Sequence, residues 1–109
     1  MVRASRSYPV TLDGRYLIVR DRLWRTSNPT LDPDHRQALV DELMRARRSV
    51  KEHREEGGTA LVEARKAVNS AKIELGERGP PWWTDGAPDY NRHLVANTPY
   101  ATWYATLDR

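Results

Sequence analysis

The sequence predicts an α+β fold: a small N-terminal antiparallel β-meander, a long antiparallel helical hairpin, and an aromatic C-terminal segment with one or two short helices packed back on it. Three observations predict it. Short apolar runs flank a turn dipeptide near the N-terminus, apolar residues recur at helical spacing through the middle, and six of the nine aromatic residues follow Gly79. A chain of 109 residues has the length of one domain. We therefore expect a single domain, 1–109, divided into a meander (1–27), a helical hairpin (32–76) and an aromatic segment (77–109).

The meander is predicted from alternation and turn chemistry. Apolar residues alternate along residues 8–12, and the dipeptide Asp13-Gly14 that follows suits the positive φ angles of a tight turn. Residues 16–19 form a partly β-branched apolar run. A second reversal near Asp21-Arg22 would return residues 23–26 alongside it. We expect two or three strands, with the arginines projecting mainly from the exposed face and the turn.

The first helix of the hairpin has a clear start. Asp32 can accept hydrogen bonds from the first amides of a helix, and Pro33 suits the first helical position because its missing N–H has no partner there. Residues 34–56 contain no Gly or Pro. The apolar stripe consists of Leu39, Leu43, Ala46 and Val50, widened by Val40 and Met44.

The second helix follows after a short connection. Gly57-Gly58 ends the first helix, and we expect Thr59 to cap a second helix that runs to about Gly76. Its apolar residues keep a heptad spacing: Leu61, Ala64, Val68, Ala71 and Leu75. Because the connection is short, the two helices must be antiparallel neighbours. Their other faces are expected to be solvated and to hold ion pairs such as Glu63 with Lys66.

The C-terminal segment starts with an extended stretch. Pro80-Pro81 keeps the adjacent tryptophans out of a helix, and Thr84-Asp85-Gly86 has turn composition. We expect Asp89 to cap a short helix reaching about Ala96, and Thr98-Pro99 to start a last one. One face of that last helix would carry Tyr100, Trp103, Tyr104 and Leu107, which we expect to pack on the helical hairpin.

The entry to this segment is the candidate surface for a ligand or partner. Tryptophan and tyrosine combine a large apolar body with a polar group, so they serve in cores and in recognition. Adjacent residues of an extended segment point in opposite directions, so at most one tryptophan of the pair is expected to be buried by the same neighbour. The candidate residues are Trp82, Trp83, Asp85, Asp89, Tyr90, Asn91, Arg92 and His93.

Catalytic chemistry has weak support. In a helix, Asp89 and His93 would share a face at the i, i+4 spacing that a metal or an acid/base pair uses. A metal would need further ligands from elsewhere, the chain has no cysteine, and it has no Gly-rich phosphate loop or nucleophile elbow. Capping and turn bonds explain these polar residues more simply. We expect no catalytic residue, no metal and no cofactor, and we expect that the protein is not an enzyme.

Charge indicates a second candidate surface. The net charge is +3, and residues 1–26 hold six arginines against two aspartates. Guanidinium groups bind phosphate and aromatic rings stack on unpaired bases, so this section predicts, as an alternative function, weak and salt-dependent binding of single-stranded nucleic acid. The equally simple interpretation is a solvated strand edge protected by charge. The candidate residues are Arg15, Arg20, Arg22, Trp24 and Arg25.

The helical hairpin suggests the leading function. Four apolar positions lie off its main stripes, where they would contact the chain's own tail or another subunit: Val40, Met44, Val62 and Ile73. We expect a non-catalytic interaction module that binds a protein partner or self-associates through the hairpin, as in a four-helix arrangement. A small-ligand or hydrolytic site around Asp85 to His93 is the remaining alternative.

Two segments, RDRLWRTSNP and GERGPPWWTDGAPDYNRHLVANTPYATWY, resemble a group of small bacterial proteins that share RLWRxSNP and WWxDGxPDxNR…NTPYxxWY motifs. The resemblance covers most of the chain. It implies a bacterial, cytoplasmic protein and carries over no activity and no catalytic residue. The N-terminal basic residues lack a following apolar region, and no apolar run approaches about 18 residues. We therefore expect a cytoplasmic protein without membrane contact.

Overall fold

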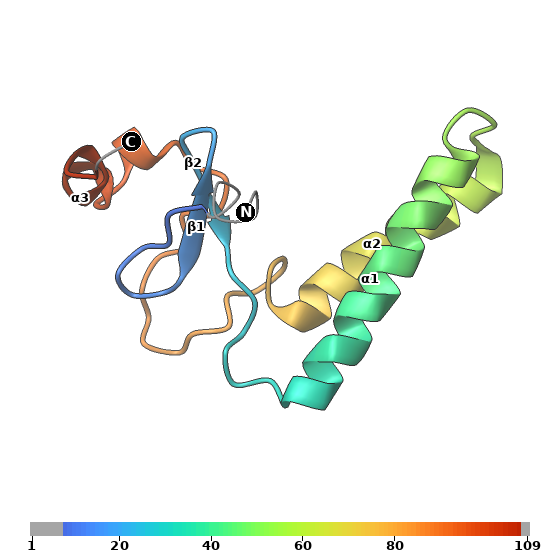
Figure 1. Ribbon diagram of the computed structural model, residues 1–109, viewed down its shortest axis with the longest axis horizontal. Helices are drawn as coiled ribbons and strands as arrows, with labels where there is room; N and C mark the ends of the chain where they lie inside the picture. Colours follow the sequence, from blue (N-terminus) through green and yellow to red (C-terminus); the bar gives the residue numbers. More distant parts are fainter. Residues whose placement is uncertain (1–7, 108–109) are drawn as a thin grey trace, which may run out of the picture. The chain divides into compact units, whose positions relative to one another are not determined.

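The computed structural model describes residues 8–107 and divides the chain into two compact units (Figure 1). The first unit is built from the described residues of Met1–Thr26 and Asp85–Arg109, and the second is Ser27–Thr84. The α+β class is confirmed, with a β hairpin near the N-terminus, two packed helices and short C-terminal helical elements. Within residues 8–107, no helix has the length and apolarity needed to cross a bilayer.

The β hairpin pairs β1 (Tyr16–Val19) with β2 (Arg22–Arg25) in antiparallel register, with Val19 opposite Arg22. Its two-residue turn consists of Arg20 and Asp21, whose φ angles are 54° and 66°. Two positive φ angles define a type I′ turn, which matches the right-handed twist of the strands. The predicted reversal is therefore present, one residue earlier than expected.

Irregular segments pair with both edges of this hairpin. On the β1 side, the Ile18 amide donates to the Pro9 carbonyl at 2.9 Å, and Val10 forms an isolated bridge with Leu17. On the β2 side, the Leu23 amide donates to the His93 carbonyl at 3.0 Å. The third strand expected over residues 8–12 is thus reduced to a single bridge.

The core of the first unit lies against one face of the hairpin. Strand alternation turns Tyr16, Ile18, Leu23 and Arg25 inward, where all four are buried together with Val95. Leu17 and Trp24, which face each other across the strands, belong to the opposite, more exposed face. The hairpin therefore has one core face and one outer face.

The helix expected over residues 89–96 is wrong. That stretch pairs with β2 through its main chain, and Arg92 has a φ of 73°, which no right-handed helix accommodates. A single 3₁₀ turn, η2 (Val95–Asn97), follows, and the last helix is α3 (Ala101–Ala105). Helix α3 starts after the expected Thr98-Pro99, although the Thr98 hydroxyl still accepts from the Tyr100 amide at 3.3 Å.

No residue of α3 itself is buried, and the aromatic face around it makes polar contacts within the first unit. The Tyr100 hydroxyl donates to Asp13 Oδ2 at 2.6 Å, and the Tyr104 hydroxyl donates to Asp21 Oδ1 at 2.8 Å. These two hydrogen bonds connect the face to two turns of the first unit, whose exposed carboxylates are the acceptors. The packing of this face on the helical hairpin stays a prediction.

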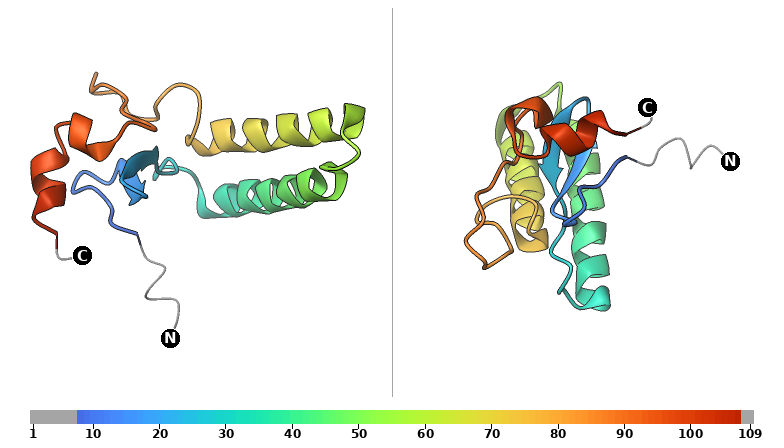
Figure 2. Two further views of the ribbon diagram at one scale, coloured as in Figure 1. Left: turned by 90° about the horizontal axis from the view of Figure 1, so that it is seen from above. Right: turned by 90° about the vertical axis from the view of Figure 1, so that its left-hand side faces the viewer.

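The second unit is the predicted helical hairpin, α1 (Pro33–His53) and α2 (Gly58–Leu75), which run side by side in opposite directions (Figure 2). Asp32 caps α1 as expected, accepting from the amides of Asp34 and His35 at 3.1 and 3.2 Å. The ion pair between Lys66 and Glu63 also forms, at 3.6 Å. The buried core cluster between the helices consists of Leu39, Leu43, Ala71 and Leu75.

Glycine geometry sets both ends of α2. The N-cap is Gly57, with a φ of 66° and no side-chain cap bond, so the expected cap at Thr59 is wrong. At the other end, Gly76 adopts the left-handed conformation at a φ of 91°. A Cβ atom on Gly76 would lie 3.0 Å from Trp82 Cδ1, so only glycine fits this close approach.

Candidate functional site: the outer face of the β hairpin

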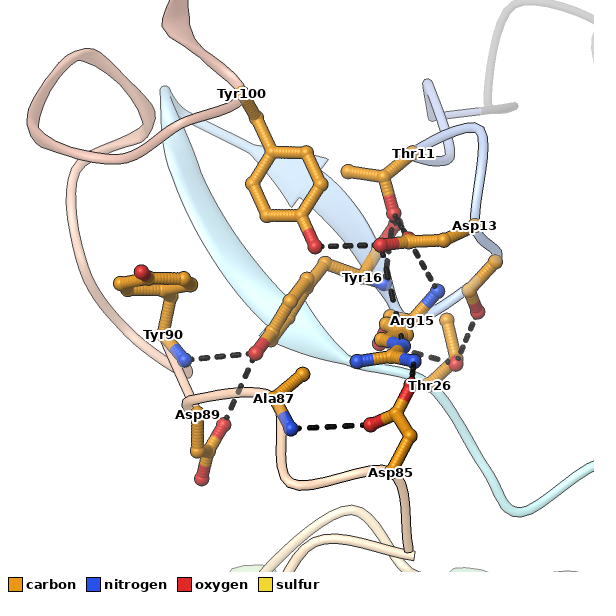
Figure 3. A network of polar contacts seen from close by, with 11 residues as sticks. Thr11, Asp13, Arg15, Tyr16, Thr26, Asp85, Ala87, Asp89, Tyr90 and Tyr100 are labelled. Atoms are coloured by element: carbon orange, nitrogen blue, oxygen red, sulfur yellow. Dashed lines mark hydrogen bonds and ion pairs between the residues drawn. The ribbon is translucent and has the colours of Figure 1, made fainter. Parts of the chain in front are cut away.

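Most polar residues of the predicted ligand surface serve to hold the β hairpin (Figure 3). Asp89 Oδ2 accepts from Arg25 Nη1 at 2.6 Å, and Asp89 Oδ1 accepts from the Tyr16 hydroxyl at 3.2 Å. Asn91 Oδ1 accepts from the Arg25 amide at 2.9 Å. These bonds connect residues that are more than sixty positions apart, so the C-terminal segment and the hairpin form one unit.

The Tyr16 hydroxyl lies at the centre of this network. It accepts from the Tyr90 amide at 2.7 Å while it donates to Asp89. Burial, together with the charge of Asp89, raises the pKa of Tyr16 to about 12. The phenol is therefore protonated at neutral pH. In this state it can donate its hydrogen bond to Asp89, but it cannot act as a general base.

Asp85 and Arg15 form an ion pair at the rim of the same unit. Asp85 Oδ1 also accepts from the Ala87 amide at 3.0 Å, which confirms the predicted turn bond. The hydrogen bond from Arg15 is the main reason that the pKa of Asp85 is lowered. Asp85 is thus an ionised structural carboxylate.

A third carboxylate, Asp13, fastens the first turn. Partial burial alone would raise its pKa, but hydrogen bonds from the Thr11 and Tyr100 hydroxyls and from the Arg15 amide lower it. On the donor side, burial and the bond to Asp13 raise the pKa of Tyr100. At neutral pH, Asp13 is therefore ionised and accepts the hydrogen bond, and Tyr100 is protonated and donates it.

Asp89 and His93 do not form the acid/base pair that the weakly supported helical interpretation would allow. Without a helix, the two side chains do not share a face: Asp89 binds Arg25, and the His93 ring stands edge-on to Tyr90 with centroids 5.8 Å apart. The Arg92 carbonyl accepts from the Arg22 guanidinium at 2.8 Å. No group of three histidine or acidic side chains suited to a metal occurs in residues 8–107.

The tryptophan pair belongs to the second unit. Trp82 and Trp83 meet edge to face, with centroids 5.2 Å apart and an interplanar angle of 83°. Trp83 is 9% exposed, whereas Trp82 is only half-buried and contacts Gly76 at the end of α2. The prediction that at most one of the pair is fully buried is confirmed. Trp82 thus lies at the end of α2, and Trp83 packs against Trp82.

The predicted arginine surface divides into two groups. Arg25 is buried against Asp89 and Arg15 is paired with Asp85, so the expectation that the arginines project mainly outward is wrong for these two. Their guanidinium groups turn toward carboxylates of the C-terminal segment, which lower the cost of burying charge. Arg20, Arg22 and Trp24 remain on the outer face. Arg3 and Arg6 lie outside the described residues.

The outer face carries a hollow of about 510 Å³. Tyr8 is 54% exposed and Trp24 is 38% exposed, which are large fractions for aromatic rings. Tyr8 is one of the aromatic residues interleaved with the N-terminal arginines, whereas Val19 is absent from the sequence-predicted sites. Strand alternation and hairpin register could have found Val19, because it lies on the same face as Trp24 and directly opposite Arg22. The hollow is lined by Tyr8, Val19, Arg20, Arg22 and Trp24.

The residues that line this hollow are typical of a binding site. Its described lining contains two aromatic rings, one β-branched residue and two guanidinium groups, and none of these described residues is a carboxylate, histidine, serine or threonine. Such a set offers apolar contact and positive charge but no general base or nucleophile. Because segments of the same unit pair with both edges of the hairpin, a partner has access to the face rather than to an open edge.

Comparisons of the chain with protein-family models, with curated proteins and with solved structures find no significant match. The resemblance described above therefore stays a prediction, and the function must be argued from the surfaces themselves.

Proposed function

We propose that the protein is a non-catalytic, cytoplasmic interaction module that binds a protein partner through the outer face of its β hairpin. The observation that carries the proposal is that the exposed rings of Tyr8 and Trp24 line one hollow together with Arg20 and Arg22. Tyrosine, tryptophan and arginine are the residues most enriched where binding energy concentrates in protein interfaces. The partner chemistry that fits is an apolar side chain flanked by carboxylates.

The helical hairpin supports self-association less well. Its exposed apolar residues are Met44 on α1 and Val62 and Ile73 on α2. Val62 and Ile73 are eleven residues apart, or about 16 Å along the helix axis. Single apolar residues spread in this way are normal on soluble surfaces and form no contiguous patch.

The residues of the alternative hydrolytic site, Asp85 to His93, form structural contacts instead. Asp85, Asp89 and Asn91 are bound by Arg15, Arg25 and Tyr16. Within residues 8–107, the described contact of the His93 ring is with Tyr90. These contacts support a binding role rather than chemistry at this place.

Peptide-display selection on the immobilised full chain tests the proposal. We expect the selected peptides to combine an aromatic or aliphatic residue with acidic neighbours. Trp24→Ala should weaken the binding of a selected peptide by about tenfold or more, since truncating a central aromatic residue costs at least 1.4 kcal/mol in such interfaces. Charge reversal in Arg20→Glu should weaken it by a smaller factor.

The matched control is Leu12→Ala, which removes an apolar side chain that is 86% exposed in the same unit but outside the hollow. Its affinity should stay within about twofold of the parent chain. The proposal fails if no peptide is enriched, or if the selected peptides bind Trp24→Ala and the parent equally well. Selection of short oligonucleotides by the same surface, with peptides ignored, would favour the single-stranded nucleic-acid alternative.

A further inference from the structure

A second surface, in the helical unit, carries a concentration of positive charge. Five cationic side chains line one hollow of about 530 Å³: Arg47 and Lys51 from α1, Arg54 at its C-cap, Arg65 from α2, and Arg78 from the segment after it. The floor consists of the half-buried Val50 and Val68, and among residues 8–107 no carboxylate contributes to the lining. We call this hollow the basic groove.

Helical spacing explains how the groove arises. Arg47, Lys51 and Arg54 are separated by four and three residues, so they lie above one another on one face of α1 and its continuation. Val50 and Val68 lie at the margin of the two apolar stripes, where the antiparallel helices meet. Arg65 is one turn before Val68 and therefore faces the same side.

The charge of the groove is not neutralised by the chain. Among the residues that the structure describes, no ion pair involves Arg47, Lys51, Arg54 or Arg65. Arg78 is held over α2 by a hydrogen bond to Asn69 Oδ1 at 3.1 Å. Like charges one turn apart on a helix are mildly destabilising, so the cluster gives no benefit to folding.

The opposite side of the same two helices is different. A hollow of about 400 Å³ lies there, and its charged lining residues are Glu42, Glu74 and Arg45. Acidic residues are thus present on both helices but absent from the basic groove. The segregation of charge between two sides of one hairpin indicates a polyanionic ligand on one of them.

We propose that the basic groove binds the phosphate backbone of a nucleic acid, without reading its sequence. Four of its five cations are arginines, whose planar forks match phosphate oxygens. Arg47 and Arg54 are about 10 Å apart along the axis of α1, which equals about three base-pair steps along the axis of a duplex. The valine floor offers no ring for base stacking and no amide for base edges, so the contact is to the backbone.

Two other polyanions fit less well. A lipid surface is flat and favours projecting apolar side chains, whereas the apolar residues here form the floor of a hollow. An acidic protein segment carries charge only at some positions and pairs less regularly with a row of cations. The proposal involves residues of the second unit alone and is independent of the peptide surface proposed above.

Fluorescence anisotropy with a labelled mixed-sequence duplex and the full-length protein tests the inference. We expect binding at low salt with little dependence on sequence. A plot of log K against log salt concentration should have a slope near −4, which corresponds to four or five phosphate contacts. A polyglutamate peptide of equal charge and vesicles of anionic lipid serve as competing probes and should displace the duplex poorly.

The decisive variants are charge-matched on one helix. Arg47→Gln with Arg54→Gln should lower the affinity by about tenfold or more at low salt and reduce the slope by about two. Arg45→Gln with Arg48→Gln removes the same charge from positions outside the groove and should stay within about twofold. Unchanged helical ellipticity of both variants excludes misfolding as the cause.

Any of three results would overturn the inference. One is equal loss of affinity in the two double variants, which would indicate net charge alone. Another is tighter binding of polyglutamate or of lipid vesicles than of the duplex. The last is no binding to the duplex at low salt.

Discussion

Arg25 Nη1 donates to Asp89 Oδ2 at 2.6 Å, across a sequence separation of 64 residues. The Arg25 side chain is 1% exposed and the Asp89 side chain is 31% exposed, so a buried cation is neutralised by a partly solvated anion. This pair fastens β2 to the C-terminal segment. It also removes both residues from the surfaces that the sequence assigned to binding.

Removing the anion should destabilise the first unit. Asp89→Ala leaves the guanidinium buried beside fewer acceptors, and breaking a buried pair costs about 3 to 5 kcal/mol. Because Asp89 is about one-third exposed, water offsets part of this cost, and we expect a loss of about 2 kcal/mol. Amide hydrogen exchange resolved by NMR would measure it as weaker protection of β1 and β2.

The control for this variant is Asp41→Asn in α1, an exposed aspartate whose side chain accepts a hydrogen bond from Gln37 on the same helix. It should change stability by less than about 0.5 kcal/mol. Equal effects of Asp89→Ala and Asp41→Asn on β1 and β2 would show that the Arg25 pair contributes nothing specific.

Alkaline pH should destabilise the protein through its buried phenols. The pKa of Tyr16 is about 12 in the folded chain against 10.0 for an unperturbed tyrosine, and the pKa of Tyr100 is also raised. The unfolded chain therefore loses these protons first, and the free energy of unfolding falls as the pH rises from about 10 to about 12. Below pH 10 the contribution is fully present. Urea unfolding at a series of pH values measures the decline.

Tyr16→Phe tests whether the loss of stability at alkaline pH arises from the Tyr16 hydroxyl. It should make the alkaline decline shallower by up to about 1.4 kcal/mol per pH unit, the limit for one group. It should also lower stability at neutral pH by about 1 to 2 kcal/mol, because the Tyr90 amide loses its acceptor. An unchanged decline in this variant would contradict the raised pKa of Tyr16.

The end of α2 should tolerate no side chain at Gly76. Gly76→Ala combines a left-handed φ of 91° with a Cβ that would lie 3.0 Å from Trp82 and 3.2 Å from Asn28. We expect a loss of about 2 kcal/mol or more in urea unfolding followed by helical ellipticity. Gly86→Ala has a similar φ of 83° but nothing within 4 Å, so it should cost only about 1 kcal/mol. A larger loss in Gly86→Ala would refute the packing argument.

The helical hairpin was predictable because its determinants are local. The cap at Asp32, the apolar stripe through Leu39 and Leu43, and the left-handed glycine at position 76 each act within a few residues. Local hydrogen bonding and period 3.6 are visible in the sequence itself. The cap at Thr59 failed because Gly57 already gives the chain the turn it needs.

The C-terminal segment was not predictable in the same way. The stretch around Asp89 and His93 has helix-compatible spacing, but it pairs with β2, and its side chains bind Arg25 and Tyr16 from the start of the chain. Such long-range contacts cannot be recognised in a single sequence, because each of the two residues, taken alone, has the features of an ordinary surface residue. Long-range pairing overrides local preference here.

The candidate sites also divide into parts that local sequence patterns predict and parts that depend on long-range contacts. Trp24 and Arg22 were identified as candidates from composition, while the inward turn of Arg25 depends on Asp89. The basic groove was not predicted, because the helical spacing of Arg47, Lys51 and Arg54 is also the pattern of a solvated helix face. Only the antiparallel packing of α2 adds Arg65 and Arg78 to one hollow.

The central claim is that partners bind the outer face of the β hairpin and not the entry to the C-terminal segment. Fluorine NMR of the protein labelled with 5-fluorotryptophan tests it directly, because the four tryptophans report from separate places and can be assigned by single Trp→Phe variants. On titration with a selected peptide, we predict that the Trp24 resonance shifts while those of Trp82 and Trp83 stay in place. A shift at Trp82 or Trp83 with Trp24 unchanged would contradict the account.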